Sequence, residues 1–299
     1  MSDIQTELKQ FAEVFNSELK HYFPCPEGEE KRVVEAMEYS VLNGGKRLRP
    51  FLVFEVAKLF ETSLEQAMRV GAALEMLHVY SLIHDDLPAM DNDDLRRGMP
   101  TCHKRFDEAT AILAGDALLT YAFEILSHRN THPDARIRCQ LVQLLSQAAG
   151  GFRGMVSGQM LDLLAEKMPN PVNPEHLIRR IEEMKTGRLL RFAVEAGAVL
   201  GGADTVQHNA LMLYAMKIGQ TFQISDDILD VEGDQALVGK TLHKDAGQNK
   251  LTFVSLYGLE AAKDIARRLT EEAAAALDIF GAKAETLVSL SKFIIERNR

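Results

Sequence analysis

Apolar residues recur at helical spacing along almost the whole chain. The segments 33–42 and 69–84 place apolar side chains three and four residues apart, and sustained alternation of apolar and polar residues is hard to find. This period predicts amphipathic helices, because strands would show a period of two. Clusters of Pro, Gly, Asp and Asn divide the periodic segments into about ten helices. The pattern therefore predicts an all-α fold.

The breaks between the predicted helices are short. The Pro-rich segment 167–174 is typical of a loop between helices, and no polar stretch is long enough to be a domain linker. We therefore expect a single domain over residues 1–299. Between Pro133 and Lys167 the apolar period continues through several glycines, which predicts one unusually long helix.

Composition and charge narrow the class of protein. The chain has 299 residues, 46% of them hydrophobic, and a formal net charge of −9 at pH 7. This acidic balance argues against a nucleic-acid-binding protein, because such domains usually carry a basic excess. Cys25, Cys102 and Cys139 form no zinc or disulfide pattern, so we expect a reducing, cytoplasmic location. No apolar run reaches the ~20 residues that span a bilayer, so we expect no membrane span.

Two aspartate-rich motifs stand out. The first, DDLPAMD, runs from Asp85 to Asp91, and the second, DDILD, runs from Asp226 to Asp230. Each motif follows an apolar, helix-patterned run. Carboxylates this close repel one another by about 4 kcal/mol per pair at 4 Å and an effective dielectric constant near 20, so a cation is expected among them. Two such helix ends that face each other across a bundle would form one site.

The spacing within each motif suits shared metal ions. The carboxylates of the second motif are three and four residues apart and can project from one side of a helix: Asp226, Asp227 and Asp230. In the first motif, a straight helix would turn Asp91 away from Asp85. Pro88 disfavours helix at the preceding residue, so we expect the chain to bend and return Asp91 toward Asp85.

Carboxylates alone form a hard donor set, which selects Mg²⁺, Mn²⁺ or Ca²⁺. A calcium-binding EF-hand loop that starts at Asp91 would need glycine where Arg96 stands. Magnesium prefers a few carboxylates plus phosphate oxygens, which Arg96, Arg97 and Lys240 can hold. The segment 233–241, GDQALVGKT, has one residue too many between its glycines for a nucleotide-binding loop and follows a helical segment. A solvated acidic loop is the alternative for either motif alone.

The sequence resembles the trans-isoprenyl diphosphate synthases, and among them the bacterial farnesyl diphosphate synthases. The resemblance covers nearly the whole chain, with these motifs in family order: GGKRLRP (44–50), HDDLPAMDNDDLRRGMPT (84–101), GQMLDL (158–163), KTGRLL (185–190), GQTFQISDDILD (219–230) and GKTLHKDAGQNKLTF (239–253). It implies an isoprenoid synthase-type helical bundle around a deep central cavity, usually as a homodimer. It also implies head-to-tail condensation of isopentenyl diphosphate with dimethylallyl and then geranyl diphosphate, which yields farnesyl diphosphate.

The resemblance also implies roles for individual residues. It implies about three Mg²⁺ ions between the two motifs and the substrate diphosphate, with Mn²⁺ as a metal of similar preference. The implied metal ligands are Asp85, Asp91 and Asp226, supported by Asp86, Asp227 and Asp230. The implied clamp on the allylic diphosphate consists of Arg96, Lys185 and Lys240. The residues implied for isopentenyl diphosphate are Lys46, Arg49, His78 and Arg97.

A glycine interrupts the helix predicted over residues 176–199. Glycine inside a helix costs about 1 kcal/mol relative to alanine, so we expect a local kink at Thr186 and Gly187. By the resemblance, the carbonyl oxygens of Lys185 and Thr186 and the amide oxygen of Gln223 stabilise an allylic cation there. Close helix packing is the alternative reason for Gly187.

The product length needs a limit. Each buried methylene gains about 0.8 kcal/mol, so burial alone favours ever longer chains. Tyr80 and Ser81 lie five and four residues before Asp85, about 6 to 7.5 Å down the same predicted helix. We expect Tyr80 to form the floor of the cavity; an ordinary core aromatic is the alternative.

The chain departs from the family pattern in its last motif, and two other functions are alternatives to prenyl transfer. Phe253 and Val254 stand where family members commonly have Tyr-Pro, which weakens any role for a tyrosine hydroxyl there. One rival function is a terpene cyclase of the same fold, which would not need a second diphosphate site formed by GGKRLRP and Arg97. The other is a non-catalytic subunit that binds prenyl diphosphates, which would not need two intact aspartate motifs.

Overall fold

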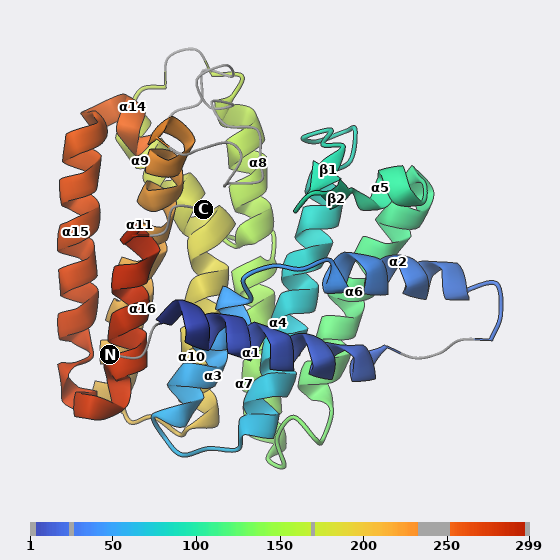
Figure 1. The fold of residues 1–299 in the computed structure, drawn as a ribbon, viewed down its shortest axis with the longest axis horizontal. Coiled ribbons are helices and arrows are strands. Elements are labelled where there is room, and N and C mark those ends of the chain that lie inside the picture. The colour runs from blue at the N-terminus through green and yellow to red at the C-terminus, as the bar shows by residue number, and fades with distance from the viewer. Residues whose placement is uncertain (1–3, 24–26, 169–170, 233–251, 297–299) are drawn as a thin grey trace. The chain divides into compact units, whose positions relative to one another are not determined.

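The computed structural model describes residues 4–23, 27–168, 171–232 and 252–296, and helices dominate these residues (Figure 1). The all-α prediction is confirmed. The chain divides into two compact units. Unit 1 comprises residues 1–54 and 63–142, and unit 2 comprises residues 55–62 and 143–299. Whether these units act as the single predicted domain stays a prediction.

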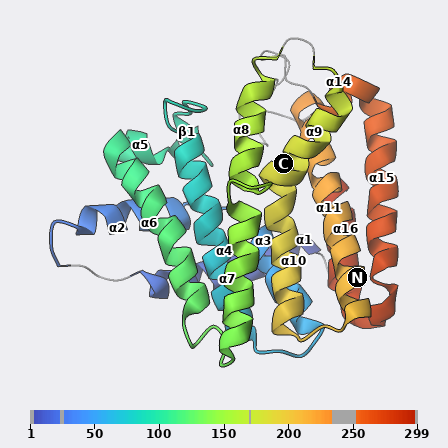
Figure 2. The same ribbon diagram turned by 180° about the vertical axis from the view of Figure 1, so that it is seen from behind.

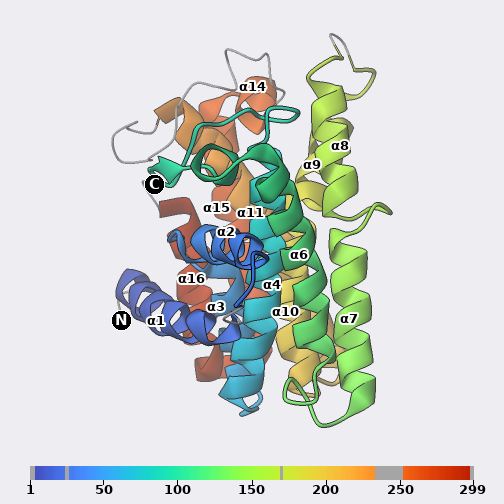
Figure 3. The ribbon, with the colours of Figure 1, turned by 90° about the vertical axis from the view of Figure 1, so that its right-hand side faces the viewer.

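Unit 1 is built around helix α4. Its helices are α1 (Ile4–Leu19), the 3₁₀ helix η1 (Lys20–Tyr22), α2 (Lys31–Leu42), most of α3 (Leu48–Lys58), α4 (Leu64–Asp85), α5 (Cys102–Arg105), α6 (Glu108–Ser127) and the first half of α7 (Ala135–Ala149). Helices α4 and α6 run side by side (Figure 3). They approach closely at Gly115, where a Cβ atom would lie 2.1 Å from Nε2 of His84. Glycine at this position therefore permits the close contact.

A short hairpin follows α4 in unit 1. Strands β1 (Leu95–Arg96) and β2 (Met99–Pro100) pair antiparallel, with Arg96 opposite Met99. The two turn residues, Arg97 and Gly98, both have positive φ, 54° and 78°. This is the backbone of a type I′ turn, whose twist matches that of paired strands. The hairpin thus holds Arg97, a predicted substrate-binding residue, in the left-handed region.

Helix α6 is the one described helix that is long and apolar enough to cross a membrane, by length and composition only. Core helices of folded proteins meet the same criterion. The helix carries Asp116 and Glu124 within its length and packs against α2 and α4 inside unit 1.

Unit 2 contains the remaining elements. They are α8 (Met155–Ala165), α9 (Pro174–Glu182), the π-helix η2 (Glu183–Gly187), α10 (Arg188–Leu200), α11 (Thr205–Glu232), α14 (Phe253–Tyr257), α15 (Leu259–Ala276), the 3₁₀ helix η3 (Asp278–Ala284) and α16 (Glu285–Glu296). Helices α11, α15 and α16 lie alongside one another (Figure 2). The Tyr214 hydroxyl on α11 donates to the Leu287 carbonyl on α16 at 2.9 Å, and the Ser225 hydroxyl donates to the Ile294 carbonyl at 2.7 Å. Both buried bonds join α11 to α16, and the bond from Ser225 holds the end of α11 that carries the second aspartate motif.

The prediction of one long helix between Pro133 and Lys167 is wrong. Helix α7 ends at Ala149 and α8 begins at Met155. The intervening residues include three glycines, and Arg153 adopts a positive φ of 60°. The apolar period continues through this segment, but the low helix propensity of clustered glycines ends the helix.

Candidate active site

The first aspartate motif forms a tight turn at the end of α4. The backbone N–H of Asp91 donates to the carbonyl of Asp85 at 2.8 Å, and that of Asn92 donates to the carbonyl of Leu87 at 3.1 Å. The exposed Pro88 lies inside this turn. The bend predicted from Pro88 is therefore confirmed, because the chain returns Asp91 to the helix end that carries Asp85.

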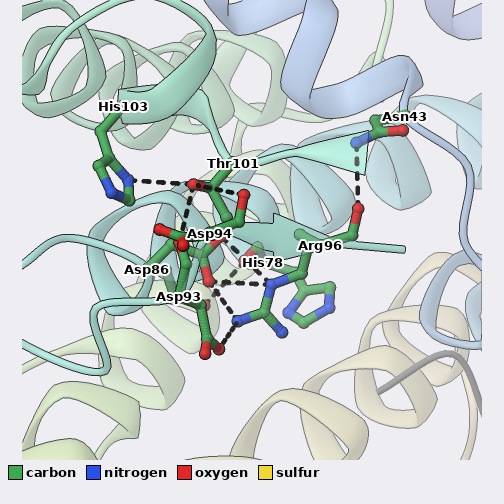
Figure 4. A network of polar contacts seen from close by, with 9 residues as sticks. Asn43, His78, Asp86, Asp93, Asp94, Arg96, Thr101 and His103 are labelled. Atoms are coloured by element: carbon green, nitrogen blue, oxygen red, sulfur yellow. Dashed lines mark hydrogen bonds and ion pairs between the residues drawn. The ribbon is translucent and has the colours of Figure 1, made fainter. Parts of the chain in front are cut away.

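Asp86 belongs to a buried ion pair (Figure 4). It is 3% exposed, and both of its carboxylate oxygens accept hydrogen bonds from Nε of Arg96, at 3.0 and 3.2 Å, with a further contact from Nη2. Nη2 also lies 3.6 Å from Asp93. Burial raises the pKa of Asp86, and the bonds from Arg96 oppose this shift. Asp86 therefore joins the acidic turn to the β1–β2 hairpin.

A second polar network, also drawn in Figure 4, fixes the loop after the turn. The hydroxyl of Thr101, which is 2% exposed, donates to the carbonyl of Asp93 at 2.8 Å and lies 3.2 Å from Nδ1 of His103. The backbone N–H of Thr101 donates to the carbonyl of Asp94 at 3.0 Å. Sequence reasoning missed Thr101 and His103. The available signal was a threonine directly after the hairpin proline, at the start of α5.

A cluster of cationic side chains surrounds His78 on α4. Nη1 of Arg49 lies 3.4 Å from Nε2 of His78. Burial, followed by the charges of Arg49, Arg97 and Arg96, lowers the pKa of His78 well below its usual value, so this imidazole is neutral at pH 7. Three of the residues predicted to hold isopentenyl diphosphate, Arg49, His78 and Arg97, thus act on one another electrostatically within unit 1.

The loop of Gly44 and Gly45, at the start of the motif GGKRLRP, lies against Arg97. Nη1 of Arg97 donates to the carbonyl of Gly44, and a Cβ atom at Gly45 would lie 2.6 Å from the guanidinium carbon of Arg97. Gly45 also has a φ of 119°. Glycine at this position is therefore required twice, for the backbone conformation and for the contact. Lys46 is exposed beside it.

Tyr80 and Ser81 occupy different surroundings on α4. Tyr80 is 6% exposed, and burial, with the charge of Asp85, raises its pKa to about 12. Its ring meets that of His84 edge to face at a centroid distance of 5.6 Å. Ser81 is half-buried, and its hydroxyl donates to the carbonyl of His78 at 2.8 Å. The chain-length roles of both residues stay predictions.

The interruption of the α-helix predicted at Thr186 and Gly187 is confirmed: the π-helix η2 lies there, between α9 and α10. At its centre, Nζ of Lys185 forms an ion pair with Asp162 of α8 at 2.6 Å. A Cβ atom at Gly158 would lie 2.3 Å from the Lys185 backbone nitrogen. The motif GQMLDL therefore serves as the surface on which Lys185 is held. π-Helical turns occur frequently at functional sites.

Gln159 of the same motif was not singled out from the sequence. It is 9% exposed, and neither its amide nitrogen nor its amide oxygen has a hydrogen-bond partner among the described residues. Gln223, which was singled out, is half-buried on α11, three residues before Asp226.

The second aspartate motif lies in the last turns of α11. Asp226 and Asp230 are half-buried, whereas Asp227 is 6% exposed and accepts a hydrogen bond from the backbone N–H of Phe253 at 2.8 Å. Burial, with the charge of Asp227, raises the pKa of Glu182 to about 9. Asp227 thus anchors the start of α14, while Asp226 and Asp230 are more accessible.

Lys240 and Cys25 lie outside the described residues, as does most of the motif GKTLHKDAGQNKLTF. Phe253, which follows directly after the undescribed segment and Thr252, is 1% exposed and lies beneath the guanidinium of Arg179 at 5.0 Å from the ring centroid.

A model of the polyprenyl synthetase family matches residues 30–285 of this chain. The chain belongs to this family. The farnesyl diphosphate synthase of Micrococcus luteus is 44% identical over 292 residues, which cover 97% of each chain. The crystal structure of an FPP/GFPP synthase from Zymomonas mobilis has a TM-score of 0.88 at 45% identity, covering 98% of this chain and 99% of that one. A geranyltransferase from Helicobacter pylori, complexed with magnesium and isoprenyl diphosphate, has a TM-score of 0.84 at 35% identity, covering 99% of each chain.

Membership in the polyprenyl synthetase family confirms three predictions. It confirms the resemblance to the isoprenyl diphosphate synthases that the motifs indicate, and it confirms the isoprenoid synthase-type fold. It also confirms that the protein is an enzyme that transfers prenyl groups. The magnesium in the Helicobacter pylori relative supports magnesium use in this family. The roles of individual residues stay predictions.

The donor chemistry of this polyprenyl synthetase fits magnesium. The accessible groups in both motifs are carboxylate oxygens, and the backbone bond from Asp91 to Asp85 brings two aspartates to one turn. Within the described ranges, no three His, Cys, Asp or Glu side chains by themselves form a group that could hold a metal ion. Magnesium commonly binds through one or two carboxylates and completes its shell with water and substrate phosphates, so a full protein cage is not required.

Proposed function

We propose that this polyprenyl synthetase condenses isopentenyl diphosphate head to tail with dimethylallyl diphosphate and then with geranyl diphosphate, which gives (2E,6E)-farnesyl diphosphate. One observation carries the proposal: two groups of opposite charge lie along helix α4, namely the arginines of α3 and the β1–β2 hairpin near His78, and the acidic turn at Asp85. His78, among its arginines, and Asp85, in the acidic turn, are seven residues apart and so share one face of the helix. They are separated by about 10 Å along its axis. One diphosphate can bind directly to the cations, and the other can bind through metal at the carboxylates.

This arrangement favours condensation over the two rivals. A terpene cyclase ionises one diphosphate and has no need of the cationic group around His78. A non-catalytic subunit has no need of like charges held close together, yet the backbone bond between Asp91 and Asp85 does hold the two aspartates in one turn. The 44% identity with the farnesyl diphosphate synthase of Micrococcus luteus, over 97% of each chain, also supports condensation over these two rivals.

The proposed roles follow the predicted residues. About three magnesium ions would be held by the accessible aspartates, and when bound they would supply charge stabilisation to the departing diphosphate. The proposed ligands are Asp85, Asp91 and Asp226, supported by Asp86, Asp227 and Asp230. The proposed clamp on the allylic diphosphate is Arg96, Lys185 and Lys240. The proposed isopentenyl diphosphate site is Lys46, Arg49, His78 and Arg97.

The chain's own groups have distinct tasks in the reaction. The allylic C1–O bond breaks, C4 of isopentenyl diphosphate bonds to allylic C1, and the proton lost from C2 goes to the released diphosphate. Three oxygens stabilise the allylic cation: the carbonyl oxygens of Lys185 and Thr186 and the amide oxygen of Gln223. Because they are weak nucleophiles, they do not trap the cation. The π-helix supports this role, because it alters the pairing of backbone carbonyls at these residues. Neutral His78 contributes a hydrogen bond and no charge.

We further propose that Tyr80 limits the product to farnesyl diphosphate and that the enzyme is a cytoplasmic homodimer. The burial of Tyr80, on the helix that ends at Asp85, supports the first point. The free thiols Cys102 and Cys139 agree with a reducing compartment.

The test is to incubate the purified protein with isopentenyl and dimethylallyl diphosphates, with and without Mg²⁺, and to size the products by chromatography. We expect farnesyl diphosphate only when Mg²⁺ is present, and we expect Asp85→Asn to lower kcat by about 100-fold or more. Asp264→Asn, which alters an exposed carboxylate on α15, is the matched control and should leave kcat unchanged. Condensation without metal, or conversion of dimethylallyl diphosphate alone, would contradict the proposal.

A further inference from the structure

Arg47 stands in the centre of the motif GGKRLRP and is the largest fully buried side chain of the described residues. Its backbone has a φ of 51°, in the left-handed region that residues with a Cβ atom rarely adopt. A charged side chain that is buried and carried on an unfavourable backbone persists only where the surrounding structure holds it in place.

Three helices of unit 1 supply the partners of this guanidinium. Nη1 donates to Oε1 of Glu75 on α4 at 2.6 Å, Nε donates to Oδ1 of Asn16 on α1 at 2.8 Å, and Nη2 donates to the carbonyl of Val41 on α2 at 2.6 Å. Glu75 is itself 3% exposed. Each of the three guanidinium nitrogens therefore bonds to protein, and Arg47 is directed into the core.

The neighbours of Arg47 have the opposite character. Lys46 is exposed, and Arg49 lies beside His78. The carbonyl of Arg47 accepts the backbone N–H of Phe51 at 3.0 Å, so the same residue starts the first turn of α3, which carries Arg49. Fixing Arg47 thus fixes the residues on both sides of it.

We propose that Arg47 is a positioning residue for the isopentenyl diphosphate site, and that Glu75 is the counter-charge that holds it. Arg47 never contacts the substrate: it anchors the loop so that Lys46 and Arg49 present their charges together. The identity of the ligand rests on the proposed function; the anchoring of the loop does not.

The competing explanation is that the pair serves stability alone. A double variant separates the two, because replacing both partners of a buried ion pair with apolar residues often leaves stability unchanged or raised, whereas removing one partner strands a buried charge. In Arg47→Met/Glu75→Leu we expect a thermal midpoint closer to that of the wild type than in either single variant, because only the neutral acceptors of Asn16 and Val41 then lose their donor. We also expect the KM for isopentenyl diphosphate to rise about tenfold, with the KM for dimethylallyl diphosphate changed less than about twofold.

Two further variants sharpen the comparison. Arg47→Lys keeps the charge but loses the branched donors, so we expect a smaller rise in the same KM. Tyr214→Phe removes a buried hydrogen bond in unit 2 and is the matched control for a general loss of stability; neither KM should change. If the double variant fails to fold, the KM of Arg47→Lys decides. Unchanged KM values, or an equal rise in both, would overturn the proposal.

A direct measurement separates this inference from the proposed function. Binding of inorganic diphosphate to metal-free protein is measured by calorimetry, and exchange of the amide hydrogens of residues 44–48 is measured by mass spectrometry. Weaker binding with faster exchange in the double variant supports the positioning role even if the wild type forms no prenyl product. Wild-type affinity and exchange in that variant would refute it, whatever the activity.

Discussion

Gly158→Ala tests how closely α8 must approach the π-helix η2. A Cβ atom at residue 158 would lie 2.3 Å from the backbone nitrogen of Lys185 and 2.7 Å from its Cα atom. These are backbone atoms that cannot rotate away, so the two elements must separate by about 1 Å to reach an ordinary contact distance of 3.4 Å.

This separation has two costs. Overpacking of this kind typically lowers the free energy of unfolding by about 1–3 kcal/mol. It also shifts Lys185 relative to Asp162, which pair at 2.6 Å and lie on the two elements that are forced apart. Because a misplacement of about 1 Å at a reacting centre can cost about 100-fold in rate, we expect kcat to fall by one to two orders of magnitude.

The assay is single-turnover formation of geranyl diphosphate, paired with urea unfolding of the same samples. Gly151→Ala is the matched control, because a Cβ atom at that position meets nothing within 4 Å. If Gly158→Ala matches Gly151→Ala in both rate and unfolding midpoint, then α8 and η2 do not constrain each other and the proposed role of the GQMLDL surface is wrong.

Two further predictions concern chain length and pH. Tyr80→Ala should lengthen the products and Ser81→Phe should shorten them, and chromatography of radiolabelled products would reveal an unchanged length in both variants as a contradiction. Burial and the charge of Asp227 raise the pKa of Glu182 from 4.5 to about 9. Between these two pH values the folded protein keeps a proton that the unfolded chain loses. Glu182 therefore lowers the free energy of unfolding progressively as the pH rises through this range. Glu182→Gln has no such proton to lose, so its gain in unfolding free energy over the wild type, measured in metal-free buffer, should be larger at about pH 8 than at about pH 5; an equal gain at both would contradict the assignment.

Local rules of the chain account for the features that the sequence predicted correctly. Pro88 acts on the residue directly before it, so the bend that returns Asp91 to Asp85 follows from a few neighbouring positions. The interruption at Gly187 is equally local. The prediction of one continuous helix across α7 and α8 was wrong because it gave more weight to the apolar period than to the low helix propensity of three clustered glycines. Both signals are present in the sequence.

The partners of the charged residues could not be predicted in the same way. Glu75 lies 28 residues after Arg47, and Asp162 lies 23 residues before Lys185, so nothing in local spacing joins either pair. Their proximity depends on how whole helices pack. A charge pattern therefore indicates which residues take part in a site, whereas the tertiary fold decides which of them face a substrate and which hold another residue.

Three ion pairs of this protein place one buried carboxylate against one cation of a predicted substrate-binding loop or helix: Asp86 with Arg96, Glu75 with Arg47, and Asp162 with Lys185. The desolvation of buried charges offsets much of their attraction, so such pairs add little net stability. What each pair does fix is direction, because the carboxylate restricts a long, flexible side chain to one orientation. A reaction that separates charge depends on dipoles and cations that are already oriented before the bond breaks. We therefore expect the carboxylates of these three pairs to act on catalysis through the cations that they orient, and replacing a carboxylate together with its cation by apolar residues should alter substrate affinity or rate more than it alters folding.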